Sequence, residues 1–119
     1  MKSREAQEQA VVIRWCEMQK NKYPELSMIY HCPNGGYRNK IEAANLKRQG
    51  VKSGVPDLFL PVPRKNKHGL FIEMKWGNNK CTPNQNKWIL KLSKLDYEVK
   101  VCYSSMEAID AIKNYLDII

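Results

Sequence analysis

The 119-residue sequence is poor in the features that mark zinc sites and membrane spans. It contains only two histidines, and its four cysteines are widely spaced with no C-x-x-C pair, so a zinc site is not expected. No apolar run approaches the ~18 residues that a spanning helix needs, so we expect no membrane segment. The charged and polar residues 2–9 do not resemble a signal peptide. We therefore expect a cytoplasmic protein with reduced thiols.

Acidic residues are also in short supply. The sequence has 12 Asp and Glu against 20 Lys and Arg, which gives a net charge of +8 and favours a polyanionic partner. The length fits a single domain, residues 1–119, with little room for a second module. A basic domain can simply carry solvated lysines, but here the basic residues cluster, which favours nucleic acid. Contacts with it are predicted from Arg38, Lys40, Lys52, Arg64, Lys65 and Lys67.

Two short segments carry a candidate active site. The first, GVPDLF at 54–59, contains Asp57, and the second, LFIEMK at 70–75, contains Glu73 and Lys75. Two carboxylates could hold a divalent cation such as Mg²⁺, which takes oxygen ligands and assists phosphodiester cleavage. Alternate residues of a strand point to the same face, so Lys75 would lie beside Glu73. There it could orient or deprotonate the attacking water, or neutralise the transition state.

A second acid-x-lysine triplet, EVK at 98–100, shows that such a triplet alone has little specificity. Apolar and polar residues alternate around Glu98, which is typical of a half-buried strand whose polar side chains are solvated. Glu73 instead interrupts an apolar run, where a carboxylate is costly unless something pairs with it. A metal could do so, but a plain ion pair with Lys75 is an open alternative. Asp57 taken alone could be a turn residue after proline.

Hydrophobic periodicity and turn signals predict an α/β domain with a mixed central sheet flanked by helices. Segments 57–62 and 70–76 are predicted to form an antiparallel hairpin, which would bring Asp57 and Glu73 together. The predicted order is helix, strand, helix, two strands, helix, strand, helix. The other predicted elements are a helix at 3–21, a strand at 27–31, a helix at 38–49 that ends at Gly50, a helix from 82 to about 95, a strand at 97–103 and a final helix from 104.

The helix after the hairpin begins with a capping-box pattern, TPNQ at 82–85. The Gln85 amide could therefore cap Thr82, or it could reach the site. Trp88, Leu92 and Leu95 follow at helical spacing, and Trp88 is predicted to lie in the core. A second capping box, SSME at 104–107, opens the last helix, whose Ile109, Ile112 and Leu116 are predicted to face inward.

The order GVPDL, then EMK, then QNKW at 85–88 resembles the PD-(D/E)xK nuclease superfamily, and specifically its VRR-NUC (virus-type replication-repair nuclease) branch. The similarity runs from the helix that holds Glu8 to about Tyr103. It implies a restriction-endonuclease-like fold in which Asp57, Glu73 and the backbone carbonyl of Met74 bind a divalent ion. It also implies that Lys75 serves the water nucleophile, that Gln85 lies near the metal or phosphate, and that Glu8 adds a ligand from the first helix, with Glu5 one turn away.

These observations predict a Mg²⁺- or Mn²⁺-dependent DNA endonuclease with no small-molecule organic cofactor. Short stand-alone relatives of this branch look like phage or viral proteins that dimerise and resolve four-way junctions, so branched DNA and a homodimer are expected, in the host cytoplasm if the chain is phage-encoded. One alternative is nicking or trimming of duplex, flap or single-stranded DNA during recombination or packaging. Another is a basic DNA-binding module without enzymatic activity.

Overall fold

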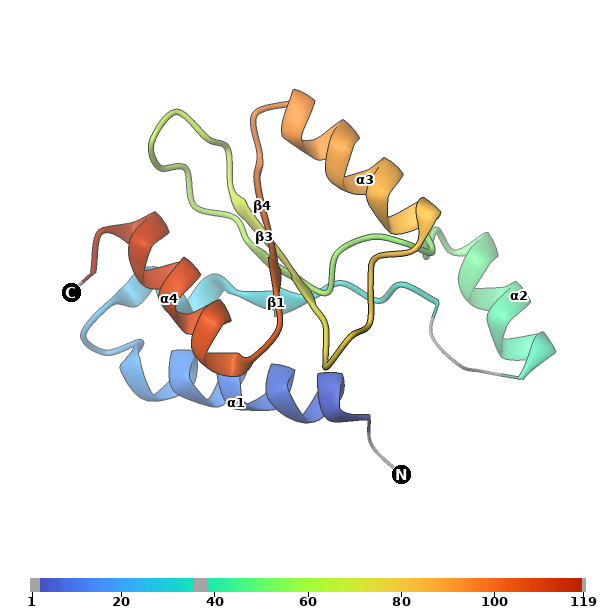
Figure 1. Ribbon diagram of the computed structural model, residues 1–119, viewed down its shortest axis with the longest axis horizontal. Coiled ribbons are helices and arrows are strands. Elements are labelled where there is room, and N and C mark those ends of the chain that lie inside the picture. The colour runs from blue at the N-terminus through green and yellow to red at the C-terminus, as the bar shows by residue number, and fades with distance from the viewer. Residues whose placement is uncertain (1–2, 36–38, 119) are drawn as a thin grey trace.

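The computed structural model describes residues 3–35 and 39–118, which form one four-stranded sheet with helices around it (Figure 1). The predicted order of elements is confirmed, with one added 3-10 helix, η1. The elements are α1 (Arg4–Gln19), η1 (Pro24–Met28), β1 (Tyr30–His31), α2 (Lys40–Arg48), β2 (Leu58–Leu60), β3 (Leu70–Met74), α3 (Pro83–Lys94), β4 (Glu98–Cys102) and α4 (Ser105–Leu116).

The sheet is mixed, with strand order β1-β2-β3-β4. Strands β2 and β3 form the predicted antiparallel hairpin, with Leu58 opposite Ile72 and Leu60 opposite Leu70. Strand β4 runs parallel to β3, because α3 carries the chain back between them. Strand β1 pairs antiparallel with β2 at the edge and has only two residues. The predicted strand at 27–31 is thus too long at its start, where Pro24 opens the 3-10 helix instead.

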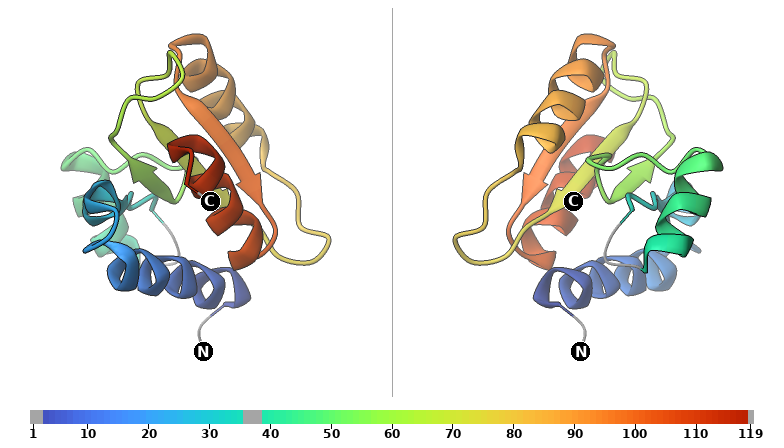
Figure 2. Two further views of the ribbon diagram at one scale, coloured as in Figure 1. Left: turned by 90° about the vertical axis from the view of Figure 1, so that its left-hand side faces the viewer. Right: turned by 90° about the vertical axis from the view of Figure 1, so that its right-hand side faces the viewer.

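The core lies between the sheet and the pair α1 and α4. Strands β2 and β3 turn alternate residues to this side, and Leu58, Leu60, Leu70, Ile72 and Met74 are fully buried there. The two helices supply the opposing side chains of the cluster, and α3 lies on the other side of the sheet (Figure 2). The helix residues buried in this cluster are Val12, Cys16, Ala108, Ile112, Tyr115 and Leu116.

Side-chain caps fix where the helices begin. The predicted capping box of α3 is confirmed, since Thr82 Oγ1 accepts from the Gln85 amide and Gln85 Oε1 accepts from the Thr82 amide. The second predicted box is only half formed. Ser104 Oγ accepts from the Glu107 amide, but the Glu107 side chain accepts from Tyr103 instead of the cap residue. The inward side chains predicted for α4 are buried: Ile109, Ile112 and Leu116.

Helix α2 stands apart from the sheet, at the right in Figure 1, and none of its residues is buried. It ends as predicted, with Gly50 just beyond it at φ +103°. The prediction that Trp88 lies in the core is wrong. In α3 only Leu92 is buried, Trp88 is half-buried and Leu95 is 63% exposed. The reason is that α3 packs chiefly on β4, on the side of the sheet away from the core.

Candidate active site

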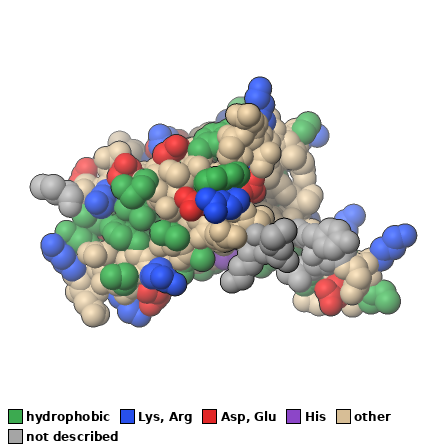
Figure 3. Space-filling view, turned by 60° about the horizontal axis from the view of Figure 1, so that its bottom comes forward, with side chains coloured by type: hydrophobic (Ala, Val, Ile, Leu, Met, Phe, Trp, Pro, Cys, Tyr) green, Lys and Arg blue, Asp and Glu red, His purple; other side chains and the backbone are tan. Residues whose placement is uncertain are grey.

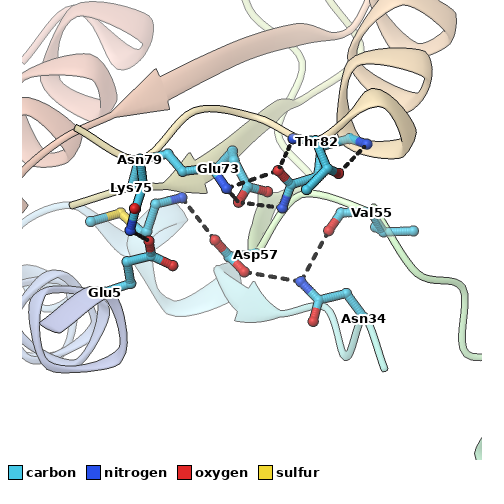
Figure 4. Close-up of polar contacts among 10 residues, drawn as sticks. Glu5, Asn34, Val55, Asp57, Glu73, Lys75, Asn79 and Thr82 are labelled. Carbon is cyan, nitrogen blue, oxygen red and sulfur yellow. Dashed lines mark hydrogen bonds and ion pairs between the residues drawn. The ribbon is translucent and has the colours of Figure 1, made fainter. Parts of the chain in front are cut away.

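Asp57 and Glu73 meet where the hairpin ends (Figure 4). Leu58 pairs with Ile72, so the next residues along the two strands, Asp57 and Glu73, lie opposite each other. Residues that face each other across an antiparallel pair bring their Cβ atoms to about 5 Å. The register of the sheet therefore places the two predicted carboxylates together.

Asp57 is held by two hydrogen bonds. Its Oδ2 accepts from the backbone N–H of Met74 at 2.8 Å, which ties the start of β2 to the end of β3. Its Oδ1 accepts from Asn34 Nδ2 at 3.1 Å, and the same amide also donates to the Val55 carbonyl at 3.3 Å. With both carboxylate oxygens engaged from opposite sides, the direction in which Asp57 points is fixed.

Glu73 is a buried carboxyl group with an unused oxygen. Its residue is only 2% exposed, and Glu73 Oε1 has no hydrogen-bond partner, the only such buried side-chain atom in the part of the chain that is described. Burial first, and then the charge of Asp57, raise the pKa of Glu73 to about 8, although Lys75 opposes the shift. A bound cation would oppose this shift and favour the ionised form of Glu73.

Lys75 and Gln85 complete the group. Lys75, 6% exposed, donates from Nζ to Gln85 Oε1 at 2.8 Å and lies 3.7 Å from Glu73 Oε2. Gln85 Nε2 in turn donates to Glu73 Oε2 at 3.2 Å. Both alternatives for Gln85 hold at once, since its Oε1 also accepts from the Thr82 amide at 2.9 Å. The start of α3 is therefore connected directly to the carboxyl pair.

The second acid-x-lysine triplet, at 98–100, is much more exposed than the triplet at 73–75. Lys100 Nζ lies 3.5 Å from Glu98 Oε1, and the two side chains are 53% and 31% exposed, against 7% for Lys75 and 3% for Glu73. It is the solvated pair that the alternation around it predicts. Only the triplet at Glu73 lies in a buried setting where its charges need a partner.

The donor set fits a divalent cation in part. An unsatisfied buried Glu73 oxygen beside Asp57 is suited to a hard ion that takes oxygen ligands. Within residues 3–35 and 39–118, no three His, Cys, Asp or Glu side chains are grouped closely enough to hold a metal. Backbone carbonyl, water or phosphate oxygens would have to complete the shell, as is common for Mg²⁺. The Met74 carbonyl as a ligand stays a prediction.

Helix α1 places its two candidate glutamates against different partners. Glu8 Oε1 accepts from the Ser105 amide at 2.8 Å, in the first turn of α4, where a carboxylate is stabilised by free N–H groups. Glu5, one turn earlier, lies on the site side. After burial and the charge of Asp57, the charge of Glu5 also raises the pKa of Glu73, and its Oε2 accepts from Asn79 Nδ2 at 3.1 Å. Glu5 therefore lies on the side of the carboxyl pair, although in the described residues it does not form a close group of three with Asp57 and Glu73.

The predicted nucleic-acid contacts divide into two groups. Arg64, Lys65 and Lys67 belong to the turn of the hairpin, at the end of β2 and β3 remote from the carboxylates. Arg64 pairs with Glu25 at 2.7 Å and Lys65 with Asp117 at 3.1 Å. Contacts of these three residues with nucleic acid stay a prediction, for a part of the surface away from the carboxyl pair, which lies at the opposite end of the hairpin.

The other basic residues lie closer to the site. Lys40 is exposed at the first turn of α2, and Lys52 is exposed in the loop that leads to Asp57. The prediction for Arg38 falls outside the described residues.

Sequence reasoning missed Asn34. It stands in a Pro-Asn-Gly-Gly segment, which the sequence pattern explains as a turn, and no local periodicity connects it with a residue 23 positions away. A polar residue next to β1, the neighbour of the strand that follows Asp57, is the one signal that could have pointed to it.

Comparison with known proteins gives the family. A model described as "VRR-NUC domain" matches residues 3–106. The chain belongs to the VRR-NUC family of nucleases. The VRR-NUC fold is also found in a solved structure described as "VRR_NUC domain protein", which is 37% identical. That match covers 99% of this chain and 92% of the other, with a TM-score of 0.82. A comparison with curated proteins found no match.

No helix in the described part of this VRR-NUC chain has the length and apolar character of a bilayer span.

Proposed function

We propose that this VRR-NUC domain is a Mg²⁺- or Mn²⁺-dependent DNA endonuclease. The observation that carries the proposal is the pair of Asp57 and a buried Glu73 whose Oε1 has no partner. The Lys75 ion pair and the Gln85 hydrogen bond both reach Glu73 Oε2, so neither uses the Oε1 atom. The net charge of +8 adds attraction for a DNA backbone.

Each residue of the site has a role in hydrolysis. Asp57 and Glu73 would hold the cation, which when bound stabilises negative charge on the phosphoryl oxygens and makes water a better nucleophile. Lys75 projects beside Glu73, where its Nζ orients the attacking water or stabilises the charge that develops in the transition state. Gln85 positions Lys75 and Glu73 relative to each other through its two hydrogen bonds.

We further propose that the substrate is branched DNA and that the protein acts as a homodimer. A dimer with two-fold symmetry would carry two active sites for two cuts in one junction. Exposed apolar side chains support a protein partner: Met18 on α1 is 72% exposed and Met28 in η1 is 49% exposed. Figure 3, which views the α1 side, shows hydrophobic side chains gathered over one half of that face.

The decisive experiment compares cleavage of a labelled mobile four-way junction with cleavage of its duplex arms, a flap and a single strand. We expect cuts in the junction with added Mg²⁺, none with chelator, and none for Glu73→Ala. Glu98→Ala, in the solvated triplet, is the matched control and should cut normally. Preference for the flap or single strand would favour the alternative nuclease activity, and absence of any cleavage would favour a DNA-binding module. A mass near 13.9 kDa by light scattering would contradict the dimer.

A further inference from the structure

A groove with a volume of about 420 Å³ runs between α2 and α3. Its lining includes Leu46 and Lys47 of α2, Lys52 and Ser53 of the following loop, and Asn84 and Trp88 of α3. None of these residues belongs to the carboxyl cluster. The groove is large enough for one small ligand and too small for a DNA duplex.

One wall is built around the Ser53 carbonyl. This oxygen accepts from Asn84 Nδ2 at 2.8 Å and from Trp88 Nε1 at 3.1 Å, and Ser53 Oγ lies 2.7 Å from the same Asn84 nitrogen. Because the single polar atom of the indole is already bonded, Trp88 presents carbon surface to the groove. The wall is therefore an aromatic side chain fixed in place by its hydrogen bond.

The other wall is apolar with a basic rim. Leu46 is half-buried in the groove, and the exposed Lys47 and Lys52 stand beside it. Among the described residues, those that line the groove include two lysines and no carboxylate. An apolar interior with positive charge at its edge matches a ligand that is flat and apolar on one part and anionic on another.

The groove adjoins the candidate active site at both walls. Asn84 immediately precedes Gln85, which bonds to Glu73 and Lys75. Gly35, which also lines the groove, immediately follows Asn34, which bonds to Asp57. A strand whose phosphate lies at the carboxylates would therefore have a neighbouring nucleotide within reach of the groove.

We propose that this groove binds one unpaired nucleotide next to the scissile phosphate, with its base against Trp88 and Leu46 and its phosphates at Lys47 and Lys52. The proposal rests on the proposed nuclease function and adds that, at the cut site of a branched substrate, one nucleotide leaves the base-paired stack next to the branch point. Aromatic side chains stack on any base, but only when the base has left the duplex stack. The lysines supply the sequence-independent part of binding.

Binding in EDTA tests the groove separately from cleavage. Fluorescence anisotropy would compare a labelled 12-nucleotide single strand with a blunt duplex of the same sequence. For Trp88→Ala we expect about 5- to 150-fold weaker binding of the single strand, the range for loss of one base stack, and little change for the duplex. Trp88→Phe keeps a stacking ring and should retain most of the affinity. Lys47→Gln with Lys52→Gln should lower the slope of log affinity against log salt by about 1.4 in total.

The matched controls are Leu90→Ala and Lys94→Gln, which change an exposed apolar and a basic side chain of α3 outside the groove. Unchanged single-strand affinity in all three groove variants would overturn the proposal. An equal loss of affinity for duplex and single strand in Trp88→Ala would also overturn it. So would a change in the mass of the protein assembly in Trp88→Ala, because it would identify the groove as a protein interface. If the wild-type protein binds the single strand through the groove but cuts no DNA, the proposed nuclease function is wrong and the proposed nucleotide-binding groove is supported.

Discussion

Asn34 Nδ2 donates a hydrogen bond to Asp57 Oδ1 at 3.1 Å, although the two residues lie 23 positions apart in the sequence. The same amide donates to the carbonyl of Val55. Asn34 thus connects the segment after β1 with the loop that delivers the carboxylate, and it orients Asp57 without any need to touch a substrate.

Asn34→Ala is expected to reduce cleavage about 10- to 100-fold, the usual effect of losing a group that orients a metal ligand. The loss should be accompanied by a rise in the Mg²⁺ concentration for half-maximal rate, because Asp57 is no longer held. A Mg²⁺ titration of the cleavage rate measures both effects. Asn86→Ala, an exposed asparagine on α3, is the control. An unchanged Mg²⁺ requirement in Asn34→Ala would show that Asn34 has no positioning role.

The raised pKa of Glu73 predicts how the metal-free protein responds to pH. The folded-state pKa of about 8 exceeds the ordinary value of 4.5, so the folded protein keeps a proton that the unfolded chain releases. Its contribution to stability is fully present below about pH 4.5 and is lost as the pH rises through 8. Glu73→Gln cannot ionise, so its stability relative to wild type should increase between pH 5.5 and pH 8.5.

Urea unfolding in EDTA at these two pH values measures the difference. Glu98→Gln, in the exposed triplet, should show the same difference from wild type at both. A wild-type stability that does not fall relative to Glu73→Gln would mean that Glu73 is already ionised in the metal-free protein.

Variants of Thr82 and Gln85 distinguish a role in capping α3 from a role in the active site. Thr82→Ala removes the side-chain cap of α3 and should lower the free energy of unfolding by about 1 kcal/mol, with cleavage retained. Gln85→Ala also frees Lys75 Nζ and Glu73 Oε2, so it should lower kcat strongly at a similar cost in stability. Thermal melts and cleavage rates of both variants test this. Equal rates in the two variants would assign Gln85 to capping alone.

Gly54 and Gly50 have similar backbone conformations but different surroundings. Both have positive φ, +89° and +103°, so alanine is strained at either position, by about 1 kcal/mol or more. At Gly50 a Cβ would meet nothing within 4 Å, whereas at Gly54 it would lie 2.9 Å from Asn84 Nδ2 and 3.0 Å from the backbone carbon of Asn84. Gly54→Ala should therefore be the more destabilising and should also impair cleavage, since it displaces α3 beside Asp57. Thermal melts and cleavage rates that are the same for both variants would contradict this close packing.

The sequence was sufficient where local patterns determine the structure. Two strand-like apolar segments joined by a charged loop predicted the hairpin and so the meeting of Asp57 and Glu73. The capping box fixed the start of α3, and with it the place of Gln85. The apolar setting of Glu73 correctly separated it from the exposed Glu98.

Sequence patterns failed where distant segments meet. Helical spacing is the same whether an apolar residue faces the core or a groove, so Trp88 was misplaced. The different partners of Glu5 and Glu8 depend on where α4 begins relative to α1, which no local signal records. A cluster of charges near a motif in sequence, as at Arg64, says nothing of distance when a strand of the hairpin lies between them.

The hairpin places the carboxyl pair and the tip of its own turn at opposite ends. Its open end fixes Asp57 against Glu73, while the turn at 61–69 lies beyond the opposite ends of β2 and β3. Val62 is buried and its carbonyl accepts from Tyr115, so the base of the turn is fixed, but residues added at the tip, between Arg64 and Lys67, would leave the buried faces of the two strands and hence their register unchanged. We expect relatives of this chain to differ in length at this turn, and inserted segments or fused modules to be accepted there without displacing the carboxylates.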